Sequence, residues 1–148
     1  ILNYYLKDVS YRNVVNDRFN QLEFQDMDIR IIILTARLKY EALGQDEKSA
    51  VVILKADLTD KLNKALEKLL LRPNYEYNVE DFESCIQILQ IAKLELEIDE
   101  MENESKQLYA LGLKDEYFKY KNDILAKQKQ VNSLKTEGRK YEPETNNR

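Results

Sequence analysis

The chain's most constraining feature is a long segment without helix-breaking residues. No Gly or Pro occurs between Pro73 and Gly112, and the next glycine after Gly112 is Gly138. Since Gly and Pro are the residues that most often interrupt regular structure, this spacing predicts two long helices. We expect the first over about 79–111 and the second over about 113–137.

The two long segments carry matched apolar stripes. On both, apolar residues recur three and four positions apart, which is the spacing of one helix face. Folding the chain back at Gly112 pairs positions whose numbers add up to 225, for example Met101 with Ile124. Residues 80–111 hold nine acidic and two basic side chains, whereas residues 113–140 hold four acidic and eight basic ones. Since opposite charges favour this partner and register, we expect an antiparallel αα-hairpin.

Shorter helices are predicted before the hairpin. The apolar spacing predicts one helix over 2–9 and a second one capped by Ser10. A longer helix is predicted from Met27 to Leu43, followed by Gly44 as its C-terminal glycine. Its centre is apolar on nearly every side, so we expect it to be buried all round. The β-branched run 31–33 also suits a strand, but the chain has no second run of comparable strength to pair with it.

Polar residues mark three further helix boundaries. Asp46 is expected to cap a short helix, Asp57 to cap an amphipathic helix that Arg72-Pro73 ends, and Asn78 to cap the long helix. The chain has only 3 Gly and 2 Pro, which argues against a multi-stranded sheet. The predicted fold class is therefore all-α, with a small helical bundle followed by a long helix and a C-terminal antiparallel helical hairpin.

Three parts are expected along the chain. Residues 1–92 form the bundle subdomain together with the start of the long helix, and residues 93–137 form a projecting helical hairpin. A helix over 79–111 would be about 50 Å long at ~1.5 Å per residue, which is longer than a small bundle is wide. Residues 138–148 are expected to form a flexible tail.

The composition excludes several chemistries. The chain has no histidine and a single cysteine, Cys85, which removes the commonest general base, an intrachain disulfide and a Cys-rich zinc site. The acidic run Glu95–Glu104 splays around its helix, whereas a cation site needs converging oxygens. No stretch approaches the ~20 apolar residues of a membrane span, and a net charge of −4 gives no overall basic footprint for nucleic acid. We therefore expect no catalytic residue, no metal and no cofactor.

Apolar residues outside the seam mark a candidate surface. Exposed apolar side chains rimmed by charge are typical of protein–protein interfaces. If the hairpin instead folds back on the bundle, the same residues are buried, and the sequence leaves both possibilities open. The lysines of the last helix could bind phosphate, or they could form ion pairs with the acidic helix. Ion pairing is the simpler explanation. The predicted partner-binding residues are Tyr109, Leu111, Leu113, Tyr117, Phe118, Lys121 and Leu125.

Four segments carry a resemblance to a known family. They are Leu2-Asn3-Tyr4-Tyr5-Leu6-Lys7-Asp8, Lys39-Tyr40-Glu41, Val79-Glu80-Asp81-Phe82-Glu83-Ser84-Cys85-Ile86 and Asp115-Glu116-Tyr117. In this order, with Phe19 and Phe24 between the first two, they resemble the C-terminal helicase-binding domain of bacterial DnaG-type primase. That family has a helical bundle, a long connecting helix and a C-terminal hairpin, and its bundle is similar in fold to the N-terminal domain of the partner helicase. The resemblance implies that the hairpin docks on the replicative helicase and couples primer synthesis to unwinding.

The resemblance also sets expectations for the whole protein. The chain opens without an initiator Met or a signal peptide, so we expect an excised, non-catalytic domain of a bacterial cytoplasmic DNA primase, which is a nucleotidyltransferase. Its partner would be the N-terminal domain of the replicative helicase, with no membrane contact and no sequence-specific nucleic-acid binding. Two alternatives stay open, namely the helicase's own N-terminal collar domain and an unrelated helical adaptor or enzyme fragment.

Overall fold

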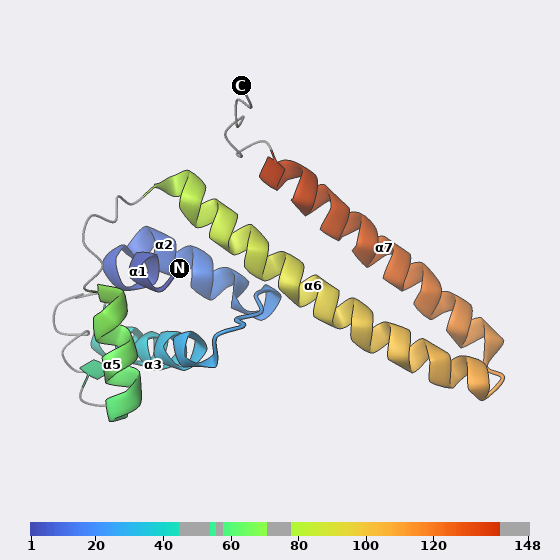
Figure 1. Cartoon of the computed structure of the whole chain (residues 1–148), viewed down its shortest axis with the longest axis horizontal. Coiled ribbons are helices and arrows are strands. Elements are labelled where there is room, and N and C mark those ends of the chain that lie inside the picture. Colours follow the sequence, from blue (N-terminus) through green and yellow to red (C-terminus); the bar gives the residue numbers. More distant parts are fainter. Residues whose placement is uncertain (45–53, 56–57, 71–77, 140–148) are drawn as a thin grey trace, which may run out of the picture. The chain divides into compact units, whose positions relative to one another are not determined.

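The computed structural model describes residues 1–44, 54–55, 58–70 and 78–139 (Figure 1). Those residues contain helices and no strand, so the predicted all-α fold class is confirmed and residues 31–33 are helical. The elements are α1 (Leu2–Lys7), α2 (Val9–Arg18), the 3-10 helix η1 (Phe19–Gln21), α3 (Met27–Leu43), α5 (Asp60–Leu70), α6 (Val79–Ala110) and α7 (Lys114–Arg139).

The chain divides into two compact units. The first contains Ile1–Asn20 and Phe24–Ile86, and the second contains Gln21–Glu23 and the chain from Gln87 onward. The change from one unit to the other falls within α6, six residues before the boundary at 92 that the sequence predicted.

An aromatic cluster and a buried arginine form much of the first unit's core. The rings of Tyr4, Tyr11 and Phe82 lie 4.6–5.3 Å apart, which joins α1, α2 and the first turn of α6. The fully buried Arg12 places its guanidinium 3.6 Å from the ring centroid of Tyr40, and its Nε donates a 3.0 Å hydrogen bond to the Tyr5 carbonyl. Cation–π contact and this hydrogen bond compensate the cation for the water it loses on burial.

One helix cap differs from the predicted one. Asp8, in an extended conformation, caps α2 and accepts a 2.8 Å hydrogen bond from the Ser10 N–H, so the prediction that Ser10 is the cap was wrong. Helix α5 begins at Asp60, where the Thr59 hydroxyl accepts from the N–H of Leu62. In contrast, Asn78 caps α6 as expected, since its side chain accepts a 2.8 Å hydrogen bond from the Glu80 N–H.

Helix α3 has the predicted bounds and ends at Gly44, whose φ of 83° is the left-handed conformation that glycine adopts most easily. The prediction that this helix is buried all round was wrong, because it buries only one face. That face contains Ile32, Ile33, Ala36 and Tyr40, whereas Met27, Ile31, Leu34 and Leu38 are exposed.

Several predicted boundaries lie outside the described residues. These are the caps at Asp46 and Asp57 and the helix end at Arg72-Pro73. The predicted tail starts at Gly138, but α7 continues to Arg139, and residues 140–148 lie outside the described part of the chain.

The second unit is built on the seam between α6 and α7, which lie side by side and antiparallel (Figure 1). Its centre is a cluster of Ile98, Ile124 and Val131, against which further apolar residues of α6 pack. Polar contacts continue the seam, since Lys127 Nζ donates to Glu97 Oε2 at 2.7 Å and Lys135 Nζ to Glu95 Oε1 at 3.0 Å. The numbers of the first pair add up to 224, one from the 225 expected for a fold-back at Gly112, whereas those of the second add up to 230, which is five from it.

Candidate protein-docking surface on the hairpin

The turn between α6 and α7 is a Schellman motif. Gly112 has a φ of 74°, its N–H donates to the Tyr109 carbonyl, and the Leu113 N–H donates to the Leu108 carbonyl. These two bonds satisfy carbonyls at the end of α6 that have no partner within the helix. The Leu113 carbonyl then accepts the first hydrogen bond of α7, from the Tyr117 N–H at 3.0 Å. A turn this tight leaves Leu111 and Leu113 on its outside, and both are exposed.

An aromatic group adjoins the turn. The Tyr109 and Tyr117 rings lie 5.2 Å apart across the two helices, and the Phe118 ring lies 5.5 Å from Tyr117. The Lys121 ammonium is 5.7 Å from the Tyr117 ring centroid, within range of a cation–π contact. A cavity of about 200 Å³ opens here, lined by Ser105, Lys106, Tyr109, Tyr117 and Lys121.

Ser105 explains how the helices approach at this point. Its side chain is fully buried in the seam, and its hydroxyl donates a 2.8 Å hydrogen bond to the Glu102 carbonyl of its own helix. A small residue whose hydroxyl is satisfied locally leaves room for a large ring on the other helix. The Tyr120 hydroxyl reaches across and donates to Glu104 Oε2 at 2.7 Å, which raises the pKa of Tyr120 because the proton is held against a carboxylate.

Two apolar residues of α7 lie away from the seam. Phe118 is 61% exposed and Leu125 is 54% exposed, although the neighbouring Ile124 is only 3% exposed. This difference follows from helix geometry, because consecutive residues differ by about 100° around the axis at 3.6 residues per turn. Apolar surface that α6 does not cover therefore runs along one side of α7.

The predicted site residues fall into three groups. The structure brings Tyr109, Tyr117, Phe118 and Lys121 into one aromatic and cationic cluster. Leu111 and Leu113 lie at the turn itself, and Leu125 lies two helical turns beyond Phe118.

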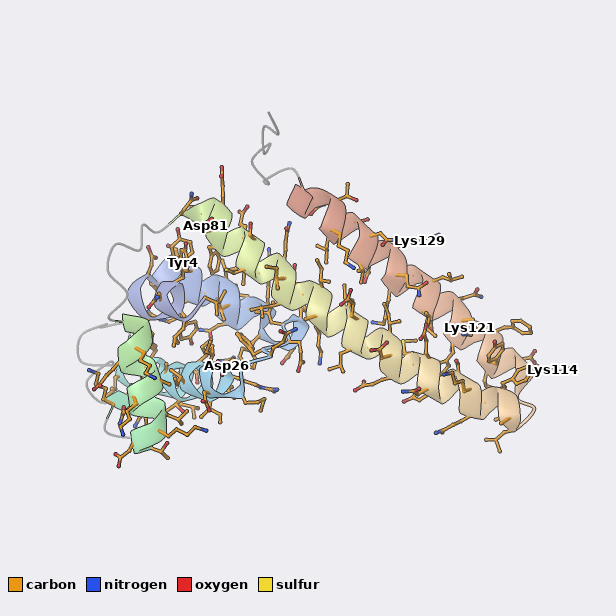
Figure 2. The ribbon with its side chains drawn as sticks, viewed as in Figure 1. Tyr4, Asp26, Asp81, Lys114, Lys121 and Lys129 are labelled. Carbon is orange, nitrogen blue, oxygen red and sulfur yellow. The ribbon has the colours of Figure 1, made fainter. Side chains whose placement is uncertain are left out.

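The lysines of α7 divide into paired and unpaired ones, a division that the sequence did not predict. Lys127 and Lys135 pair with carboxylates of α6, as the simpler explanation predicted. Lys114 and Lys129 are exposed and make no ion pair with any residue that the structure describes. Figure 2 shows Lys114, Lys121 and Lys129 spread along α7 from the turn onward. A helical projection of the sequence places Lys127 and Lys135 closer to the seam residue Ile124 than Lys114 and Lys129.

Comparison with known proteins gives no relative, since no family model, no curated protein and no solved structure matches the chain. Within the described ranges, no three or more Cys, Asp or Glu side chains are grouped so as to hold a metal ion. None of the helices that the structure describes is both long enough and apolar enough to cross a membrane.

Proposed function

We propose that this chain is a protein-interaction domain that binds the replicative helicase, as the C-terminal domain of a bacterial DnaG-type primase does. In that role it recruits a primase to the helicase in the bacterial cytoplasm and contributes no catalytic residue of its own. The observation that supports this proposal is the exposed apolar surface around the hairpin turn. A monomer gains nothing from leaving an aromatic ring and several leucines in water, whereas a docking protein uses them as anchors.

The supporting geometry separates folding from docking. The residues that hold α6 and α7 together, such as Ile98, Ile124 and Val131, are buried in the seam. The predicted docking residues Phe118 and Leu125 are outside it. Substitutions at the second set should therefore affect binding without unfolding the hairpin.

The test is calorimetric titration of the chain into purified replicative helicase. Phe118→Ala should weaken binding by roughly thirtyfold, because truncating a buried interface aromatic commonly costs about 2 kcal/mol. Leu125→Ala should have a smaller effect in the same direction. The melting temperature of both variants should be almost unchanged, because neither side chain packs in the seam.

Leu38→Ala is the matched control. Leu38 is an exposed leucine on α3, in the first unit, and its truncation should leave helicase binding unchanged. Wild-type affinity in both α7 variants would mean that the docking surface lies elsewhere. A chain that assembles into a stable ring and does not bind helicase would instead favour the helicase's own collar domain.

A further inference from the structure

We infer that one flank of α7 docks an acidic, amphipathic helix of the partner protein. We call this surface, formed by Lys114, Phe118, Lys121, Leu125 and Lys129, the cationic–apolar flank. The inference rests on the proposed function, since it specifies the chemistry of the partner that the hairpin would bind.

The five residues form a continuous surface. They stand at positions i, i+4, i+7, i+11 and i+15 of α7, which fall within an arc of roughly 80° at 3.6 residues per turn. This arc is centred roughly 100° away from the seam stripe of Tyr117, Ile124 and Val131. Cations and apolar groups therefore alternate along this flank, and the half-buried Lys121 lies at its edge nearest α6, where it lines the cavity with Ser105 and Tyr109.

The distribution of charge on α7 supports a cationic surface. Residues 113–140 contain four acidic side chains, and all four project outside the arc of roughly 80° that the cationic–apolar flank occupies. Beyond Lys129 the arc continues with the neutral Asn132 and Thr136, and the next cation in it is Arg139, the last residue of α7. Pairing with α6 does not account for the lysines of the flank, because its two ion pairs with α7 use Lys127 and Lys135.

The alternation of lysines and apolar residues along the flank indicates that the partner element bound there is a helix. Phe118 and Leu125 are about 10.5 Å apart along the axis, which is two helical turns. A partner helix with apolar residues at the same seven-residue spacing would cover both of them. Carboxylates on the edge of that helix would then lie against lysines that are spaced about 10–12 Å apart.

Nucleic acid fits this flank less well. B-DNA presents one phosphate about every 1.7 Å of its axis, whereas the flank offers one lysine in about 10 Å.

The test compares two triple variants of the whole chain in binding to purified replicative helicase at about 50 mM and about 500 mM NaCl. In the first, Lys114, Lys121 and Lys129 are each replaced by Gln. In the second, the control, Lys61, Lys64 and Lys68 on α5 are replaced by Gln, which is the same charge change on exposed residues of another helix. We expect the flank variant to bind roughly tenfold more weakly at low salt, to approach the wild type at high salt, and to keep its melting temperature. The control variant should bind as the wild type does.

Three outcomes would overturn the inference. If the wild type binds helicase but the flank variant has the same affinity and salt dependence, the flank is not the recognition surface and the proposed function still stands. If the wild type does not bind helicase, the proposed function and the flank's partner are both wrong. If a short DNA duplex binds the chain more tightly than helicase does, and the lysine substitutions abolish this, the flank recognises nucleic acid.

Discussion

Ile124→Asp tests whether the seam and the first unit are separate folding units. Ile124 is 3% exposed and belongs to the seam cluster with Ile98 and Val131. The substitution removes an apolar side chain from this cluster and places a carboxyl group beside the buried side chains of Ile98 and Val131. We expect α6 beyond Gln87 and all of α7 to lose stability while α3 keeps it.

The free-energy cost of Ile124→Asp has two parts. Losing a buried isoleucine side chain costs about 2–3 kcal/mol. The introduced carboxyl must either ionise in an apolar site or stay protonated at pH 7, and staying protonated costs about 4 kcal/mol at 1.36 kcal/mol per pH unit above its unfolded pKa of ~3.9. The second part disappears as the pH falls towards ~4, because the unfolded chain then binds the same proton. Stability lost at neutral pH should thus be partly regained in acid.

Leu125→Asp is the matched control. It introduces the same carboxyl one residue further along α7, at a side chain that is 54% exposed, so it should cost well under 1 kcal/mol. Hydrogen exchange at pH 7 and pH 5, read separately for peptides of α3 and of α7, measures both variants. Only Ile124→Asp should accelerate exchange in α7, and the acceleration should be smaller at pH 5.

Two results would refute this reasoning. Equal loss of protection in α3 and α7 would mean that the two units unfold together. Equal effects of the two aspartate variants would mean that the burial difference between Ile124 and Leu125 does not hold in solution.

Two further predictions concern the turn and the first unit's core. Gly112→Ala should destabilise the hairpin by about 1 kcal/mol in urea unfolding, because a φ of 74° is unfavourable for alanine. The added Cβ would meet no atom within 4 Å, so the cost comes from the backbone conformation alone. Gly112→Asn should cost less, because asparagine tolerates a positive φ better than alanine does. Burial raises the pKa of Tyr5 to about 12, so between pH 10 and 12 the unfolded chain releases this proton while the folded chain keeps it. Stability should therefore fall with rising pH in that range, by up to ~1.4 kcal/mol per unit, and Tyr5→Phe should remove this contribution to the slope.

The hairpin was the part of the fold that the sequence specified best. Its helices are long, so many apolar positions and charges agree on one pairing, and Gly112 fixes the place of the turn. The Lys127–Glu97 contact lies within one residue of the predicted register. The apolar periodicity, the charge distribution and the position of Gly112 all indicate the same structure there.

The first unit was predicted less well because its details depend on tertiary contacts. Asp8 and Ser10 are both good cap residues, and only the extended backbone at Asp8 decides between them. The apolar run of α3 does not indicate how many other elements pack against the helix. The structure leaves Leu34 and Leu38 exposed. The burial of Arg12 depends on Tyr40, which is distant in the sequence, so no local pattern could have indicated it.

On α7, the direction in which a side chain points determines its role more than its chemical type does. Ile124 and Leu125 are adjacent aliphatic residues, yet one is in the seam and the other is exposed. Lys127 and Lys129 are both lysines two positions apart, yet only Lys127 is bound to α6. Because Tyr117, Ile124 and Lys127 each have a chemically similar neighbour on the flank, pairs of substitutions separated by one or two residues can distinguish folding from docking. If docking used the seam residues instead, the hairpin would have to open on binding, and the affinity would fall with every substitution that stabilises the seam.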